Sequence, residues 1–119
     1  MATANSRLRV RRQDGVIIVE FIDRNILDEA NIQMIGEEIT ALVDSEANPK
    51  LLVSFANVDH LSSAALGTLI TVNNRVRPKN GQLKLANIDP QIYEVFVITR
   101  LNKLFSIHGT TEEALKSFT

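Results

Sequence analysis

The chain has 119 residues, of which 45% are hydrophobic and 23% are charged, and its 13 basic and 14 acidic side chains leave a net charge of −1. This length suits one hydrophobic core, and the balanced charge gives no general attraction to nucleic-acid phosphates or anionic lipid. Because the chain has no cysteine, disulfides, thiolate catalysis and cysteine-based metal sites are excluded.

The first six residues are short and polar, unlike the apolar centre of a signal peptide. No apolar run in the sequence approaches the length of a membrane span. We therefore expect a cytoplasmic protein without a membrane segment. The expected organisation is a single domain over residues 1–119, with a loose N-terminus over residues 1–6.

A β-hairpin is predicted next. Residues Leu8–Gln13 alternate apolar and basic side chains, which is the period of a half-buried edge strand. Asp14 and Gly15 form a two-residue turn signal, so Val16–Ile22 is expected to pair antiparallel with the first strand. The arginines of the first strand favour a soluble sheet edge, with a docking surface for an acidic partner as the alternative.

A polar connection is predicted over Asp23–Leu27, and a helix follows it. Asp28 can cap this helix, which is expected to end at about Asp44. Its isoleucines, leucine and valine recur at helical spacing, so one side of the helix is apolar.

The rest of the chain alternates short apolar runs with amphipathic helices. Strands are predicted at Leu51–Phe55, Gln82–Asn87 and Leu104–Ile107, and helices at Ala64–Val76, after Asp89-Pro90 and after the capping box Thr110–Glu113. The resulting order is β-β-α-β-α-β-α-β-α. It predicts an α/β domain with a central mixed sheet, an initial antiparallel hairpin and about four helices packed on the sheet.

The most unusual local sequence lies between the strand at Leu51–Phe55 and the next helix. Ligands of open α/β sheets bind where strands lead into helices. Ser62 and Ser63 stand at the helix start, where the first backbone N–H groups have no helical partner. A serine there can cap the helix, and a phosphate there would meet the positive end of the helix dipole. Both interpretations of the serine pair are open from the residues alone.

The stretch VDHLSSAALG, from Val58 to Gly67, resembles the signature of the STAS domain of bacterial anti-sigma-factor antagonists. In that family an apolar residue and usually an aspartate precede a phosphorylatable serine. Ser63 matches this serine, and Leu66 with Gly67 matches the leucine-glycine pair that closes the signature. Asp28 matches an aspartate that the family carries before its first long helix, so the resemblance extends over nearly the whole chain.

The resemblance implies a non-enzymatic regulatory switch without a cofactor or metal. Such a protein binds an anti-sigma factor that is also a serine kinase, and thereby frees the sigma factor. Phosphorylation of the serine breaks the complex, and a PP2C-type phosphatase restores it. The residues expected to meet the partner are Asp28, Ser62, Ser63, Ala64, Leu66 and Gly67. The protein is expected to be a monomer or weak dimer.

Three positions depart from the family pattern. Ser62 stands where the family usually has aspartate, which makes it an alternative phosphorylation site. Ala64 replaces a second hydroxyl residue, and Ala65 replaces a glycine. The alternative function within the same family is that of a non-phosphorylated scaffold subunit in a larger signalling assembly.

Catalytic and metal sites are not expected. A serine hydrolase is disfavoured because Leu61 and Ala65 occupy the glycine positions of a nucleophile elbow around Ser63. The histidines, His60 and His108, are isolated from one another in the sequence, and no convincing set of carboxylates accompanies either of them.

Overall fold

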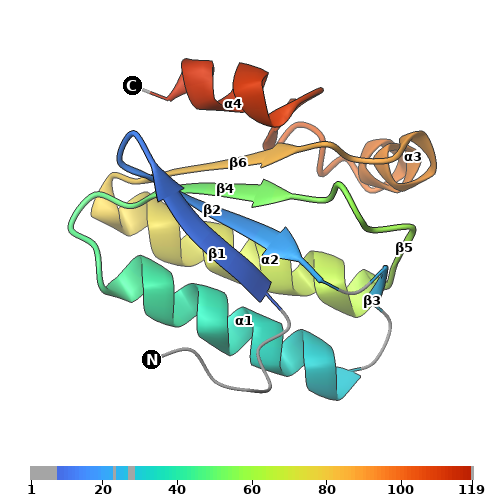
Figure 1. The fold of residues 1–119 in the computed structure, drawn as a ribbon. Coiled ribbons are helices and arrows are strands. Elements are labelled where there is room, and N and C mark those ends of the chain that lie inside the picture. The colour runs from blue at the N-terminus through green and yellow to red at the C-terminus, as the bar shows by residue number, and fades with distance from the viewer. Residues whose placement is uncertain (1–7, 23, 27–28, 119) are drawn as a thin grey trace.

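The computed structural model describes residues 8–22, 24–26 and 29–118, which form one α/β domain (Figure 1). The main strands are β1 (Leu8–Gln13), β2 (Val16–Phe21), β4 (Lys50–Ser54), β6 (Gln82–Ala86) and β7 (Ser106–His108); the helices are α1 (Glu29–Asp44), α2 (Ser63–Val76), α3 (Pro90–Ile98) and α4 (Thr111–Ser117). The N-terminus expected to be loose and the cap expected at Asp28 lie outside the described residues. None of the described helices has the length and hydropathy of a membrane span.

The five-stranded sheet has the order β1-β2-β4-β6-β7. β1 and β2 pair antiparallel from Leu8 opposite Phe21 to Gln13 opposite Val16, whereas all other neighbours in this sheet are parallel. Asp14 and Gly15 have φ of 54° and 81°, the positive values that a tight two-residue hairpin turn requires. The predicted mixed sheet with its initial hairpin is therefore confirmed.

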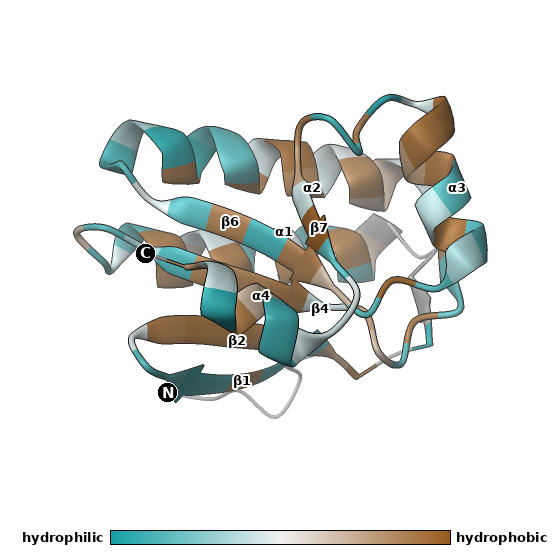
Figure 2. Ribbon diagram, turned by 90° about the horizontal axis from the view of Figure 1, so that it is seen from above, coloured by the Kyte–Doolittle hydropathy of each residue, from teal (hydrophilic) through white to brown (hydrophobic). Residues whose placement is uncertain are grey.

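Helices cover both faces of the sheet, as Figures 1 and 2 show. Successive side chains of a strand point to opposite faces. On β2, Ile17 and Val19 therefore join the core under α1 and α2, while Val16 and Ile18 join a second, smaller core. Ala114 of α4 completes that smaller core.

The predicted polar connection over Asp23–Leu27 is wrong for two residues. β3 (Asn25–Ile26) pairs parallel with β5 (His60–Leu61) in a separate two-stranded sheet. Two-residue strands carry no hydrophobic period, and this pair forms because residues distant in the sequence meet through their backbones. The small sheet is relevant to function because β5 leads directly into α2.

The last strand begins later than predicted. Leu104 and Phe105 both donate backbone hydrogen bonds to the carbonyl of Leu101, at 3.0 Å each, so they lie in a turn and β7 starts at Ser106. The turn lets the buried Phe105 ring pack against Phe96, with the two ring centroids 6.1 Å apart.

A row of four phenylalanines crosses the domain near the carboxyl ends of the parallel strands. The ring centroids of Phe21 and Phe55 are 5.2 Å apart, and Phe96 lies 6.5 Å beyond Phe55. Phe105 ends the row. Aromatic pairs at such separations add to the free energy of burial, so the row attaches α3 to the sheet through Phe96.

Candidate functional site

Ser62 is the N-cap of α2. Its backbone is extended, with φ −81° and ψ 164°, and its Oγ accepts a hydrogen bond from the backbone N–H of Ala65 at 3.3 Å. Its carbonyl oxygen accepts the N–H groups of Ala65 and Leu66. The side chain and the carbonyl of Ser62 therefore share the N–H of Ala65, in the first turn of the helix where a capping side chain is favoured.

Ser63 has a different environment from its neighbour. It is the first residue of α2 and its side chain is exposed. Within the described part of the chain its hydroxyl makes no hydrogen bond. The first turn of α2 carries no acidic residue, so nothing in that turn opposes a negative charge. Of the two serines, Ser62 is engaged as a cap and partly buried, whereas Ser63 is exposed.

The first two turns of α2 divide into an outer and an inner side. Ser63, Ala64 and Gly67 are exposed, and a Cβ atom built on Gly67 would meet no atom within 4 Å. Leu66 is only 4% exposed and packs in the core under α2. The sequence prediction that Leu66 meets a partner is therefore wrong, because the helix turns this side chain inwards. The exposed side of the first two turns of α2 therefore carries only small side chains.

Arg24 and Asp59 fix the segment that leads into α2. The backbone N–H groups of Asp59 and His60 donate to the carbonyl of Arg24, at 2.7 and 3.2 Å. The Arg24 Nε and Nη2 atoms lie 2.9 and 2.8 Å from Asp59 Oδ2. Sequence reasoning missed this pair, because an isolated arginine and a distant aspartate carry no motif. Asp28 lies outside the described residues, two positions beyond the end of β3.

A partly buried polar cluster holds the start of the same loop, just after β4. Asn87 donates through Nδ2 to Ser54 Oγ at 2.9 Å and to Thr111 Oγ1 at 2.7 Å. Ser54 is 1% exposed, and its Oγ also accepts the N–H of Ala56 at 3.4 Å. Buried polar groups need such partners. The cluster was not predicted, since it joins residues from β4, α4 and the loop after β6.

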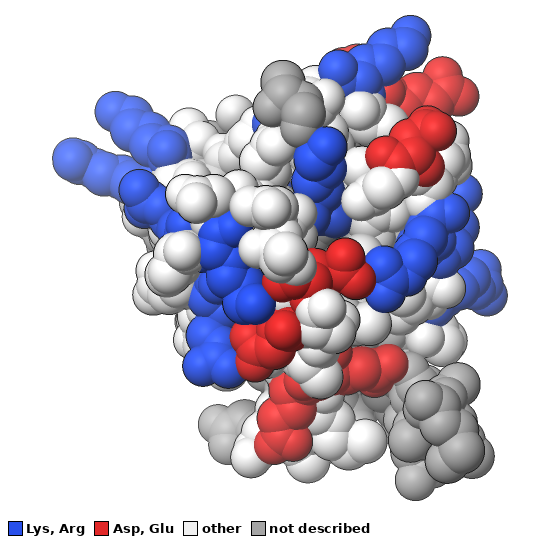
Figure 3. Space-filling model, turned by 90° about the vertical axis from the view of Figure 1, so that its left-hand side faces the viewer, with Lys and Arg blue, Asp and Glu red and all other residues white. Residues whose placement is uncertain are grey.

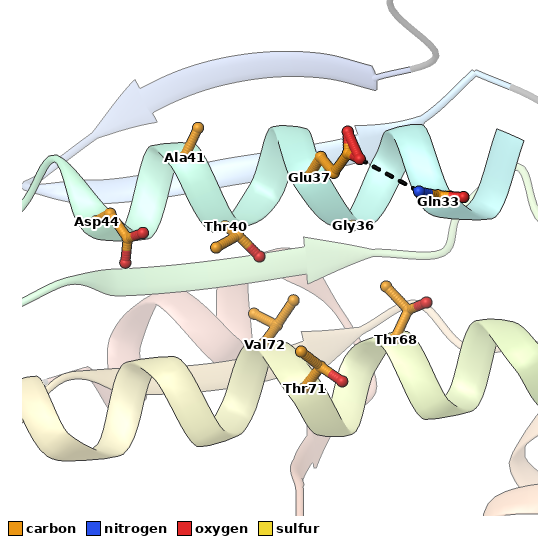
Figure 4. A pocket seen from close by; sticks show the side chains of 9 residues that line it. All are labelled: Gln33, Gly36, Glu37, Thr40, Ala41, Asp44, Thr68, Thr71 and Val72. Atoms are coloured by element: carbon orange, nitrogen blue, oxygen red, sulfur yellow. Dashed lines mark hydrogen bonds between the residues drawn. The ribbon is translucent and has the colours of Figure 1, made fainter. Parts of the chain in front are cut away.

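A groove of about 470 Å³ lies between α1 and α2 (Figure 4). It is lined by Gln33, Gly36, Glu37, Thr40, Ala41, Asp44, Thr68, Thr71 and Val72. Its carboxylates are engaged: Glu37 accepts a hydrogen bond from Gln33, and Asp44 pairs with Arg75. The helices approach closely where a Cβ on Gly36 would lie 2.8 Å from Thr68 Cγ2. The groove is thus a shallow seam between two packed helices.

The two histidines have different environments in the described structure. His60 is exposed on β5, while His108 Nε2 lies 3.0 Å from Ser106 Oγ and 3.2 Å from Ser117 Oγ, which joins β7 to α4. Within the described ranges, no group of three histidine, aspartate or glutamate side chains is placed to hold a metal ion.

The end of the domain opposite the start of α2 carries interleaved charges of both signs (Figure 3). Arg12 pairs with Glu46 at 3.1 Å, and Arg75 pairs with Asp44. Lys79 donates to the carbonyls of Asp44 and Glu46, at 3.3 and 2.9 Å. Because acidic side chains alternate with the basic ones, the described residues of this end present no uniform basic surface of the kind that binds phosphate backbones.

Known proteins share both sequence and fold with the chain. BtrV of Bordetella bronchiseptica, a candidate anti-sigma factor antagonist, is 26% identical over 112 residues, which cover 94% of each chain. A STAS domain anti-sigma-factor antagonist from Planctomyces limnophilus superimposes with a TM-score of 0.85 at 21% identity, over 92% of this chain and 96% of the other. Bacillus SpoIIAA in its phosphorylated form superimposes with a TM-score of 0.70 at 17% identity, over 92% and 96%.

The sequence profile of the STAS domain matches residues 7–114. The match spans every described strand and helix from β1 to the first half of α4, and includes the loop that carries Ser62 and Ser63. The chain therefore belongs to the STAS domain family.

Proposed function

We propose that the chain is an anti-sigma-factor antagonist, and that phosphorylation of Ser63 releases it from its anti-sigma factor. The observation that carries the proposal is the division of roles between adjacent serines. Ser62 Oγ is bonded to the N–H of Ala65, whereas the Ser63 hydroxyl is exposed at the first position of α2. The similarity to BtrV and to the Planctomyces protein supports the same assignment.

A phosphate on Ser63 suits the local backbone. It would add nearly two negative charges and three acceptor oxygens, close to the N–H groups of Ser63 and Ala64, which have no partner within the helix. The helix dipole favours an anion at this end. Bacillus SpoIIAA has been solved in unphosphorylated and phosphorylated forms, and each superimposes on this chain with a TM-score of 0.70. We therefore expect phosphorylation to leave the fold intact.

The same phosphate would oppose binding of a partner. The outer side of α2 is narrow at Ala64 and Gly67, so a protein can approach the helix backbone closely. A doubly charged group on Ser63 fills this space and requires desolvation if the partner is to stay. The proposed partner is an anti-sigma factor that is also the serine kinase, and a PP2C-type phosphatase reverses the modification. Asp28, Ser62, Ser63, Ala64 and Gly67 form the proposed contact.

The site assignment is tested by incubating the chain with the serine-kinase anti-sigma factors of its own organism and ATP, followed by peptide mass spectrometry. We expect one phosphate, on Ser63. Ser63→Ala should abolish the modification, and Ser62→Ala should retain it. Phosphate on Ser62 alone would contradict the assignment. A chain that stays unmodified and forms a large assembly by itself would instead have the scaffold role.

The switch is tested by binding measurements on Ser63→Asp, with Ser63→Asn as a control of similar size and no charge. Because the Ser63 side chain makes no hydrogen bond within the described residues, both variants should fold like the wild type. Ser63→Asp should bind the anti-sigma factor at least tenfold more weakly than Ser63→Asn. Equal affinities for the two variants would rule out a charge-operated switch.

A further inference from the structure

Exposed apolar side chains concentrate on α3 and the turn that follows it. The described residues include eight large hydrophobic side chains that are exposed, and five of them fall between residues 93 and 104. These five are Tyr93, Val95, Val97, Ile98 and Leu104. Ile98 is 76% exposed, the highest value of the eight. Single exposed hydrophobic residues are common, but a cluster of them marks an interaction site.

The composition of α3 does not match the burial that the domain gives it. Its sequence is PQIYEVFVI, in which Gln91 and Glu94 are the polar side chains. In this helix only Ile92 and Phe96 are buried, on the side of the helix that faces the sheet. A helix that is apolar nearly all round is usually covered on all sides, so the outer side of α3 lacks a cover within the described chain.

The position of α3 links it to the proposed phosphorylation site. Figures 1 and 2 place α3 at the end of the domain where α2 begins and where β5 lies. The ring of Phe96 packs edge-on against Phe55, at a centroid distance of 6.5 Å, and Phe55 opens the loop that ends at Ser62. A protein seated over Ser63 therefore has α3 at the margin of its contact.

The charges at the apolar cluster differ between the helix and the turn: α3 carries the exposed Glu94, whereas the turn after it is basic. Arg100 and Lys103 lie in the turn between Ile98 and Leu104, and both side chains are exposed. Neither forms an ion pair with a carboxylate of the described residues, unlike Arg12 and Arg75 at the opposite end of the domain. The complementary surface is therefore apolar, with acidic groups on the side that faces this turn.

We infer that residues 93–104, which we name the α3 surface, form a second docking surface for the anti-sigma factor that meets Ser63. This inference rests on the proposed function. The matching surface of the partner is an apolar groove with carboxylates at its margin. The α3 surface holds the partner through apolar burial, while the α2 start carries the charge-operated switch. Loss of the α3 surface should therefore weaken binding of the kinase and leave the phosphoryl-transfer step unchanged.

The test uses a double variant that carries both Ile98→Ser and Leu104→Ser. The control is Met34→Ser, because the Met34 side chain on α1 is also exposed, at 42%. Steady-state phosphorylation of Ser63 and binding of the unmodified chain to the same anti-sigma factor are measured. We expect the double variant to raise KM and Kd at least tenfold with kcat unchanged, and the control to match the wild type. Arg100→Glu should raise Kd further at low salt than at high salt.

The outcomes separate this inference from the proposed function. If Ser63 is phosphorylated and the double variant has wild-type KM and Kd, the α3 surface is refuted and the switch stands. If the wild type binds the anti-sigma factor but is never phosphorylated, while the double variant loses binding, the switch is refuted and the α3 surface stands. A wild type that binds no anti-sigma factor refutes both.

Sedimentation with phosphatidylserine vesicles tests whether the α3 surface binds anionic lipid instead. Exposed apolar side chains beside Arg100 and Lys103 would also suit an anionic lipid surface. Vesicle binding that the double variant loses, together with unchanged binding to the anti-sigma factor, would assign the surface to lipid and overturn the inference.

Discussion

Arg24 and Asp59 contact each other through both backbone and side chain, and so join the residues after β2 to the residues that enter α2. Their side chains are 74% and 45% exposed, so the ion pair itself contributes little to global stability. Its effect is local. Because β3 and β5 contain two residues each, this contact acts together with the buried side chain of Val58 to keep the loop before Ser62 in place.

Arg24→Ala should therefore loosen the loop without unfolding the domain. We expect the free energy of unfolding to fall by less than about 1 kcal/mol, while the amides of Asp59 and His60 exchange several-fold faster. Hydrogen exchange followed by NMR measures both effects. Arg12→Ala is the control, since it removes a remote exposed ion pair with Glu46. Unchanged exchange at both amides in Arg24→Ala would show that the backbone bonds suffice.

The two serines should differ in their effect on stability. Ser62→Ala removes the cap of α2 and should lower the free energy of unfolding by about 1 kcal/mol, whereas Ser62→Asn should keep most of it. Ser63→Ala should change it by less than about 0.5 kcal/mol, because no bond in the described residues is lost. Urea denaturation of the variants provides the values. A larger cost at Ser63 than at Ser62 would contradict the assigned roles.

Gly67→Ala should stabilise the fold and weaken partner binding. Its added Cβ meets open space, and alanine is favoured over glycine inside a helix by about 1 kcal/mol. The same methyl group would stand where the anti-sigma factor is proposed to approach. Thermal unfolding and a binding assay give the two results. Gly81→Ala is the contrasting variant, because its Cβ would lie 2.4 Å from the carbonyl oxygen of Pro49, so it should destabilise the domain.

Phe96→Ala should detach α3. The ring is fully buried in the phenylalanine row, so truncation should lower the free energy of unfolding by about 3–5 kcal/mol. Ile98→Ala on the same helix is the control and should cost less than about 0.5 kcal/mol, since its side chain is mostly exposed. Denaturant unfolding distinguishes the two. Similar costs for both variants would mean that α3 is covered in solution.

The larger elements could be predicted from the sequence because each carries its own period or cap. Asp89 caps α3 by accepting the N–H of Gln91 at 2.8 Å, and Thr110 caps α4 by accepting the N–H of Glu113 at 3.1 Å, as the residue types indicate. β3, β5 and the start of β7 could not be found in this way. These short elements depend on which distant backbone segment lies beside them, and that is determined only by the tertiary fold.

The residue types alone could not divide the roles of the two serines. Adjacent serines before a helix have equal claim to the cap, and only the backbone path decides that Ser62 takes it. The inward turn of Leu66 follows from the phase of α2 against the sheet. A signature shows which residues recur together, but it does not show which of them face solvent.

The small core under α4 has a consequence for synthesis of the protein. Val16, Ile18, Leu52 and Ala86 lie on a sheet face that, among the described helices, α4 covers. α4 is the last described element to leave the ribosome, at about 5–20 residues per second. Until then the nascent sheet has one face closed by α1 and α2 and one face open. A chaperone that recognises apolar surface would meet the nascent chain on that open face.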